Sequence, residues 1–116
     1  MVFSQLLNYK GQNTTNKEFT KNLQHLRSIV DEIDEEIINW LAKRMDVIDQ
    51  IGEYKRDNNI TVLQLERWLE IINTRTAWAE TKGLNKEFIQ KVCQIMHKES
   101  IRKQTDLINT PSKTNT

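Results

Sequence analysis

The sequence of 116 residues is poor in residues that break helices, form disulfides or bind metals. It holds three Gly and one Pro, which favours long helices over a fold built on tight turns. A single cysteine, Cys93, excludes an internal disulfide, and with only two His it argues against a structural metal site. The net charge of +1 gives no general attraction to nucleic acid or to an anionic membrane.

Long apolar runs are also missing from the sequence. No stretch approaches the ~20 apolar residues that span a bilayer. The start, MVFSQLLNYKGQNTTNKEF, has neither the apolar core nor the small-residue cleavage site of a secretory signal. We therefore expect a cytoplasmic protein.

The residues that are abundant predict an all-α fold of three helices. Apolar residues recur at three- and four-residue steps from Val30 to Ile51, which is typical of an amphipathic helix. We predict helices over 18–57, 63–81 and 86–108, with stops at Asn58-Asn59 and Gly83 and an N-cap at Asn85. Residues 1–17 are expected to be a flexible tail or linker, 18–109 a helical domain, and 110–116 a disordered tail.

The first predicted helix is too long for one compact chain. About 40 residues at ~1.5 Å each give ~60 Å, whereas a globule of this size is only ~35 Å across. The uncovered length predicts an intertwined helical homodimer. The alternative is a kink in this helix near Gly52.

Two cations interrupt the apolar series of this helix. Arg44 falls between Leu41 and Ile48, and Lys55 falls one step after Ile51. Neither has an acidic residue at the three- or four-residue spacings of an intrahelical ion pair. Because a buried unpaired cation costs several kcal/mol, an anion is expected from another helix or from a ligand. The alternative is that both side chains reach past the edge of the seam into water.

Further polar residues extend this pattern. On the third predicted helix the apolar stripe continues through Ser100 and Gln104, and Arg67 opens the second helix near the same end as Lys55. Arg27 lies about 100° around the first helix from Arg44 and is expected to face a partner chain. Cations and neutral donors without a nucleophile–base pair suit a small molecule rich in carboxylates.

The motifs at these positions resemble the all-helical class of chorismate mutase. The resemblance spans residues 23–107 and is specific because the motifs are spread over all three predicted helices. The matching stretches are LR at 26–27, IDEEI at 33–37, LAKRM around Arg44, IGEYK ending at Lys55, VLQLERW with Arg67, and ESIRKQ with Ser100 and Gln104.

The resemblance implies rearrangement of chorismate to prephenate, on the branch to phenylalanine and tyrosine, with no metal and no cofactor. It implies that Arg44 and Arg27 of the partner subunit hold the two substrate carboxylates. Lys55 and Gln104 would reach the ether oxygen of the breaking C–O bond. The remaining implied contacts are Arg67, Ser100 and Gln64 to carboxylate and hydroxyl groups, and Ile51 as an apolar wall.

Two positions depart from the family pattern. Trp68 stands where many relatives carry Glu for the ring hydroxyl, and Gln64 stands where Asp is usual. Trp68 is expected to be a core residue, and Gln64 or a water to receive the hydroxyl.

Two alternative functions stay open: an isochorismate pyruvate lyase on the same fold, and a weakly active module that binds prephenate or a partner enzyme. The segment from Phe3 to Phe19 looks like a connector. The VLQ…RW wording at 62–68 resembles mutase domains fused behind a 3-deoxy-heptulosonate-7-phosphate synthase, which implies a module fused to, or associated with, such an enzyme.

Other residues of chemically versatile types receive no functional role from their spacing. His25 and His97 are expected in packing or at the surface, and Cys93 in the core. The three Trp residues lie on separate turns, which argues against a platform that stacks nucleotides.

Overall fold

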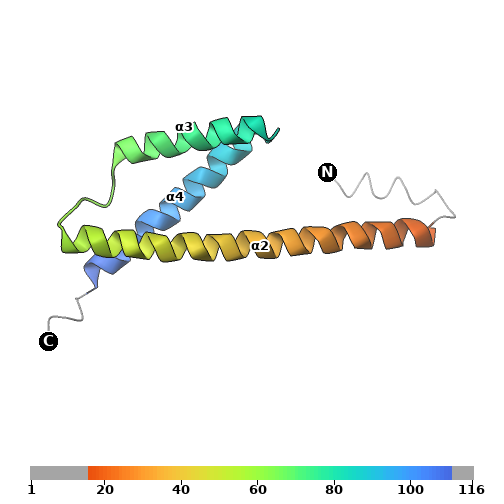
Figure 1. Cartoon of the computed structure of the whole chain (residues 1–116), viewed down its shortest axis with the longest axis horizontal. Coiled ribbons are helices and arrows are strands. Elements are labelled where there is room, and N and C mark those ends of the chain that lie inside the picture. Colours follow the sequence, from red (N-terminus) through yellow and green to blue (C-terminus); the bar gives the residue numbers. More distant parts are fainter. Residues whose placement is uncertain (1–15, 111–116) are drawn as a thin grey trace. The chain divides into compact units, whose positions relative to one another are not determined.

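The computed structural model describes residues 16–110, which form three helices and confirm the predicted all-helical class. These are α2 (Asn16–Asp57), α3 (Leu65–Thr81) and α4 (Lys86–Asn109) (Figure 1). The predicted tails, 1–17 and 110–116, lie outside the described residues except for Asn16 and Lys17, which begin α2, and Thr110, which caps α4. The chain divides after Leu41 into two compact units.

The C-terminus of α2 lies where the sequence predicts it. Asn59 adopts a positive φ of 54°, and the N–H of Ile60 donates to the carbonyl of Lys55 at 2.8 Å. This six-to-one hydrogen bond closes a helix end whose carbonyls would otherwise be unpaired, and Asn tolerates the left-handed geometry better than most side chains.

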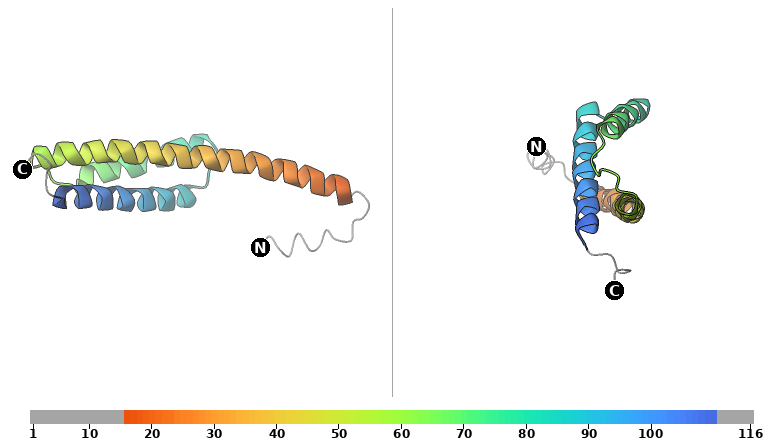
Figure 2. Two further views of the ribbon diagram at one scale, coloured as in Figure 1. Left: turned by 90° about the horizontal axis from the view of Figure 1, so that it is seen from below. Right: turned by 90° about the vertical axis from the view of Figure 1, so that its left-hand side faces the viewer.

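The turn between α3 and α4 uses the predicted stop and start residues. Gly83 has a φ of 71°, and the N–H of Leu84 donates to the carbonyl of Ala79 at 2.9 Å. Asn85 then caps α4 by accepting a hydrogen bond from the N–H of Phe88 at 2.8 Å. This compact turn returns α4 against α3, as the two views of Figure 2 show.

Gly52 does not interrupt α2, because the helix continues through it to Asp57. Its role is instead to let α4 approach closely. A Cβ at this position would lie 2.8 Å from Leu107 Cδ2 and 3.4 Å from Gln104 Cγ. The missing side chain therefore allows the α4 turn that carries Gln104 to pack directly on α2.

The second unit, from Ala42 onward, contains all the buried residues of the described chain. The buried apolar side chains, Ile71, Ala79 and Cys93, lie on α3 and α4. Two further buried residues of α4, Ser100 and Gln104, are polar. Ser100 and Gln104 are therefore a large part of the surface that α4 buries, because the apolar core is small.

The first unit carries an exposed apolar stripe on α2. Between 16 and 41 no residue is buried. The stripe repeats at three- and four-residue steps, and its members are Leu26, Val30, Ile33 and Ile37, each at least half exposed. No described helix combines the length and the apolar character needed to cross a membrane.

Replacing Gly52 by Val is expected to destabilise the fold by about 1–3 kcal/mol, because the added methyl groups must displace Leu107 and Gln104. Val has a better intrinsic helix propensity than Gly, so any loss reports packing. Urea unfolding followed by circular dichroism measures the change. The matched control is Gln50→Val at an exposed position of the same helix; an equal loss in both variants would contradict the close-approach role.

Candidate functional site

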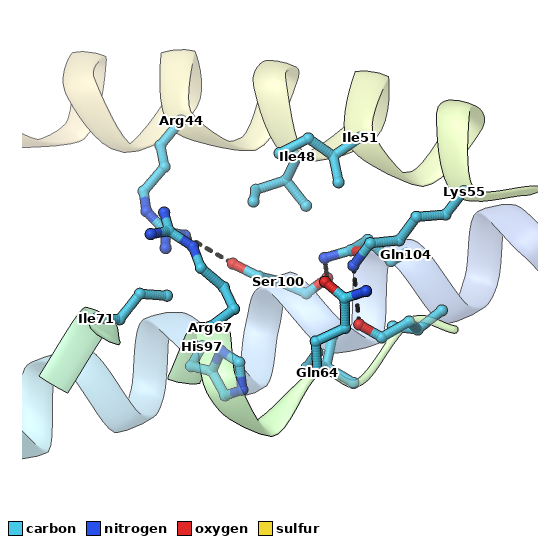
Figure 3. Close-up of a pocket in the computed structure, with 12 residues that line it drawn as sticks. Arg44, Ile48, Ile51, Lys55, Gln64, Arg67, Ile71, His97, Ser100 and Gln104 are labelled. Carbon is cyan, nitrogen blue, oxygen red and sulfur yellow. Dashed lines mark hydrogen bonds between the residues drawn. The ribbon is translucent and has the colours of Figure 1, made fainter. Parts of the chain in front are cut away.

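One pocket of about 270 Å³ lies within the second unit, between the C-terminal part of α2, the start of α3 and α4 (Figure 3). This volume is near the lower end of the ~300–1,000 Å³ typical of small-molecule sites. Its wall contains every predicted site residue except Arg27. The lining residues are Arg44, Ile48, Ile51, Lys55, Val62, Gln64, Arg67, Ile71, His97, Ser100, Ile101 and Gln104.

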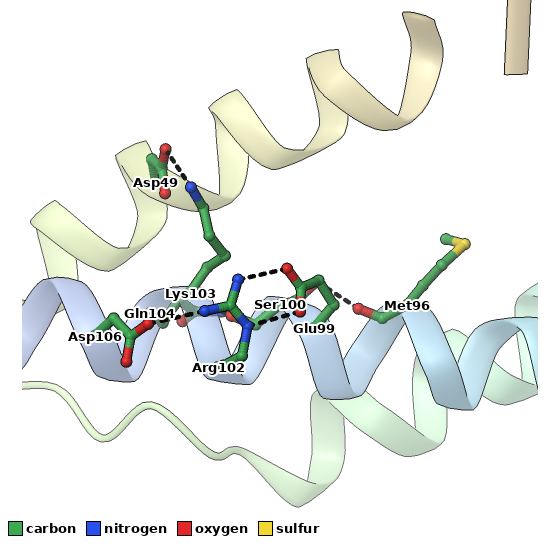
Figure 4. Close-up of polar contacts among 8 residues, drawn as sticks. All are labelled: Asp49, Met96, Glu99, Ser100, Arg102, Lys103, Gln104 and Asp106. Atoms are coloured by element: carbon green, nitrogen blue, oxygen red, sulfur yellow. Dashed lines mark hydrogen bonds and ion pairs between the residues drawn. The ribbon is translucent and has the colours of Figure 1, made fainter. Parts of the chain in front are cut away.

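Arg44 is held by a neutral acceptor on α4. Its Nη1 donates to Ser100 Oγ at 2.6 Å, and that hydroxyl donates in turn to the carbonyl of Met96 at 2.8 Å (Figure 4). Ser100 is 3% exposed, so the acceptor is fixed in place. A guanidinium has five N–H donors, and most of those of Arg44 remain available to a ligand.

Lys55 is held in the same way at the other end of the pocket. Its Nζ donates to Gln104 Oε1 at 2.8 Å and to the carbonyl of Val62 at 2.9 Å. Gln104 is 4% exposed, and its Nε2 donates to the carbonyl of Ser100 at 3.2 Å. An ammonium has three N–H donors, so Lys55 keeps one for a ligand while its position is set by two neutral oxygens.

The electrostatics of the pocket are those of uncompensated positive charge. Burial lowers the pKa of Arg44, and the neighbouring cations Arg75 and Arg67 lower it further. Burial also lowers the pKa of Lys55. The charged form of each side chain is therefore less stable in the pocket than in water, and an anion bound between the two cations would stabilise it.

No acid of the described chain neutralises these two cations. The ion pairs found between residues 16 and 110 lie elsewhere: Arg56–Asp57, Arg67–Glu70, Arg102–Glu99, Arg102–Asp106 and Lys103–Asp49. Figure 4 shows the pairs that run along and beside α4. Arg44 and Lys55 thus meet neutral oxygens, which orient a cation without cancelling its charge.

The remaining predicted residues complete one side of the pocket. Arg67 is about half exposed and pairs with Glu70, and Figure 3 shows its side chain reaching toward the Arg44 end. The side chain of Gln64 makes no capping hydrogen bond at the start of α3 and stays available to the pocket. Ile51 lines the pocket with an apolar side chain.

Arg27 lies on the N-terminal part of α2, in the first unit, and is exposed. It is not among the residues that line the pocket. Its predicted role as a ligand contact therefore depends on a second copy of the chain and stays a prediction.

Sequence reasoning missed His97. Its imidazole lines the pocket and stacks on Trp68, with ring centroids 4.5 Å apart and the planes inclined by 28°. Burial lowers the pKa of His97, and Arg44 and Lys55 lower it further. The sequence does place His97 three residues before Ser100, on the same face of α4. The spacing alone does not distinguish a face that lines a pocket from one that packs in the core.

The pocket offers no metal site and no nucleophile with a base. Within 16–110 no group of three or more His, Cys, Asp or Glu side chains is placed to hold a metal ion. What the site can do is bind a small anion at two fixed points and place donors against charge that develops between them. These features define an all-helical protein whose described part contains a cationic pocket suited to a small carboxylate ligand.

Comparison with known proteins gives the family. Residues 26–105 match the family described as chorismate mutase type II. The chain belongs to this family and is a chorismate mutase type II domain. No solved structure matches the chain significantly.

Curated relatives carry this domain in different contexts. The T-protein of Haemophilus influenzae is 30% identical over 82 residues, which cover 71% of this chain and 22% of the relative. A bifunctional chorismate mutase/prephenate dehydratase of Buchnera aphidicola is 31% identical over 88 residues, 76% of this chain and 23% of the relative. The chain thus spans less than a quarter of these proteins. The isochorismate pyruvate lyase of Pseudomonas aeruginosa is 30% identical over 76 residues, 65% of this chain and 74% of the relative.

Replacing Arg44 by Met is expected to raise the pKa of His97 toward its ordinary value of 6.5, because a nearby positive charge disfavours the imidazolium. Titration of the ring protons by nuclear magnetic resonance measures the change, with His97→Gln used for assignment. Lys103→Met is the matched control, since it removes a cation that lies outside the pocket and pairs with Asp49. An unchanged pKa in Arg44→Met would contradict the electrostatic link between the two side chains.

Proposed function

We propose that this domain binds chorismate in the described pocket and rearranges it to prephenate, a step of aromatic amino acid biosynthesis. The observation that carries the proposal is the pair Arg44 and Lys55. Both are partly buried, both are held by neutral oxygens of α4, and neither has an acidic partner in the described chain. A ligand with two carboxylates supplies the missing negative charge.

Arg44 is proposed to bind one substrate carboxylate. Its guanidinium is fixed by Ser100 and keeps the planar pair of N–H groups that match a carboxylate. Arg67 points to the same end of the pocket and adds a second cation. Their mutual repulsion lowers the pKa of Arg44 and makes anion binding more favourable.

Lys55 and Gln104 are proposed to act at the ether oxygen of the breaking C–O bond. Negative charge grows on this oxygen in the transition state, and a fixed donor there contributes roughly 3–4 kcal/mol. The third N–H of Lys55 and the second N–H of the Gln104 amide have no partner among the residues described. Because both groups are already oriented, they need no reorganisation during the reaction.

The proposed reaction requires no proton transfer and no covalent intermediate. One C–O bond breaks and one C–C bond forms within a single molecule, so the pocket has to hold a flexible dianion in its compact reactive shape. Ile48 and Ile51 on α2 and Ile71 on α3 supply the apolar wall against which such a shape can be held. This agrees with a site that lacks a nucleophile–base pair.

A second candidate function is the elimination of pyruvate from isochorismate. It is favoured by the similarity to the isochorismate pyruvate lyase, of which this chain covers 74%. The same cations would bind the dicarboxylate. Loss of chorismate absorbance and release of pyruvate from isochorismate, measured on one preparation, separate the two activities.

We further propose that the active form is an intertwined homodimer. Residues 16–41 of α2 have an apolar stripe with no covering element in the described chain, and most helical stability comes from burying such a face. The three- and four-residue spacing is that of a seam between helices. A second copy would cover it and would bring its own Arg27 to the substrate.

The predicted fusion or association with a 3-deoxy-heptulosonate-7-phosphate synthase stays part of this proposal. The relative from Buchnera aphidicola is named for a mutase joined to another enzyme, prephenate dehydratase. A relative that joins a mutase to another enzyme supports the idea of a mutase module within a larger protein.

Arg44→Met and Lys55→Met are each expected to reduce kcat/KM for chorismate by at least 100-fold, because each removes a fixed donor from a partly buried site. The loss of chorismate absorbance measures turnover. Lys103→Met is the matched control, since it removes a cation of α4 that lies outside the pocket, and it is expected to keep wild-type turnover.

Near-normal rates in both pocket variants would contradict the proposed site. Very slow wild-type turnover combined with tight prephenate binding would instead favour the alternative function, a weakly active module that binds prephenate or a partner enzyme. Circular dichroism of each variant verifies that helicity is retained.

Mixing inactive Arg27→Ala and Arg44→Ala chains is expected to restore about one quarter of the sites. Half of the randomly exchanged dimers combine both variants, and each such dimer has one site with intact Arg44 and Arg27. Chorismate turnover before and after subunit exchange measures the recovery. Exchange confirmed by mass spectrometry without any recovery would contradict shared sites.

A further inference from the structure

The proposed chemistry gives no role to His97, which lines the pocket. His97 lies on α4 three residues before Ser100 and seven before Gln104, so all three share one helix face. Figure 3 shows its ring on the α3 and α4 side of the pocket, across from Ile48 and Ile51. Neither ring nitrogen has a hydrogen-bond partner within the part of the chain that the structure describes.

The imidazole of His97 stacks on an aromatic side chain of the neighbouring helix. Trp68 of α3 stacks on it with a centroid distance of 4.5 Å, and both side chains are partly buried. A stacked ring loses rotational freedom before a ligand arrives, which lowers the entropy cost of a later contact. His97 is therefore positioned by an apolar face and keeps both ring nitrogens for other partners.

The environment of His97 favours its neutral form. Burial, Arg44 and Lys55 all lower its pKa, so at neutral pH one ring nitrogen is a donor and the other an acceptor. Three cations already line the pocket, and each provides only hydrogen-bond donors, so acceptors are few among the lining side chains.

The pocket has many donors and few free acceptors. Ser100 Oγ accepts from Arg44, and Gln104 Oε1 and the Val62 carbonyl accept from Lys55. Two side-chain acceptors among the lining residues accept no hydrogen bond from the described chain: His97 and the Gln64 amide. Gln64 is exposed and has no recorded hydrogen bond to orient its side chain, whereas His97 is held by the stack.

Chorismate carries a ring hydroxyl in addition to its two carboxylates. The carboxylates require donors, and the hydroxyl, as a donor, requires an acceptor. Resting on the proposed function, we propose that His97 is a specificity residue whose unprotonated ring nitrogen accepts a hydrogen bond from the ring hydroxyl of the substrate, with Trp68 as its positioning residue.

The experiment compares chorismate with its analogue that lacks the ring hydroxyl. In wild-type protein, kcat/KM is expected to be roughly tenfold higher for chorismate, the size of one hydrogen bond to a neutral group. In His97→Leu it is expected to fall roughly tenfold for chorismate and to stay unchanged for the analogue. His97→Gln restores an acceptor in the same place and is expected to recover part of the preference.

The comparison separates a hydroxyl contact from a structural role. If His97→Leu lowers turnover of both compounds equally, the proposal is overturned, because a merely structural residue cannot sense the hydroxyl. If the preference survives in His97→Leu but disappears in Gln64→Leu, the hydroxyl belongs to Gln64 and the proposal is likewise overturned. Wild-type protein that converts neither compound would overturn the proposed function itself, independently of His97.

Discussion

The site depends on how two cations are fixed without being neutralised. Arg44 and Lys55 project from α2, and their partners Ser100 and Gln104 are almost fully buried on α4. A carboxylate partner would have neutralised each cation in an ion pair, and neither would have kept its charge for a ligand. Neutral oxygens orient the same cations and leave their charge for a ligand, and partial burial strengthens that charge by limiting screening by water.

This arrangement requires α2 and α4 to approach closely. Gly52 lies one turn before Lys55, and its missing side chain lets Gln104 and Leu107 pack on the α2 backbone. The buried polar pair, Ser100 and Gln104, takes the place of apolar core where the helices meet, and both side chains are hydrogen-bonded there. The rest of the second unit, with Ile71, Ala79 and Cys93, supplies the apolar core that holds α3 and α4 together.

This chorismate mutase type II domain has, within residues 16–110, a pocket lined by cations and neutral donors. Such a site has to bind, orient and stabilise charge, and the described residues are suited to these tasks. The stack of His97 on Trp68 adds an element that a purely cationic pocket lacks. In the role proposed for it, His97 adds a neutral acceptor to the positive charges of this pocket.

The amino-acid sequence by itself determined the helices, their ends and most of the pocket residues. Apolar spacing, Asn59, Gly83 and Asn85 act over a few residues, so they predict local structure directly. Arg44 and Lys55 were identifiable because cations are costly in an apolar seam. Only the tertiary structure decided that their partners are neutral oxygens, that Gly52 permits a close approach instead of a kink, and that His97 faces the pocket. These outcomes depend on contacts between helices that are about 50 residues apart in the chain, as Lys55 and Gln104 are, and spacing along one helix does not encode such contacts.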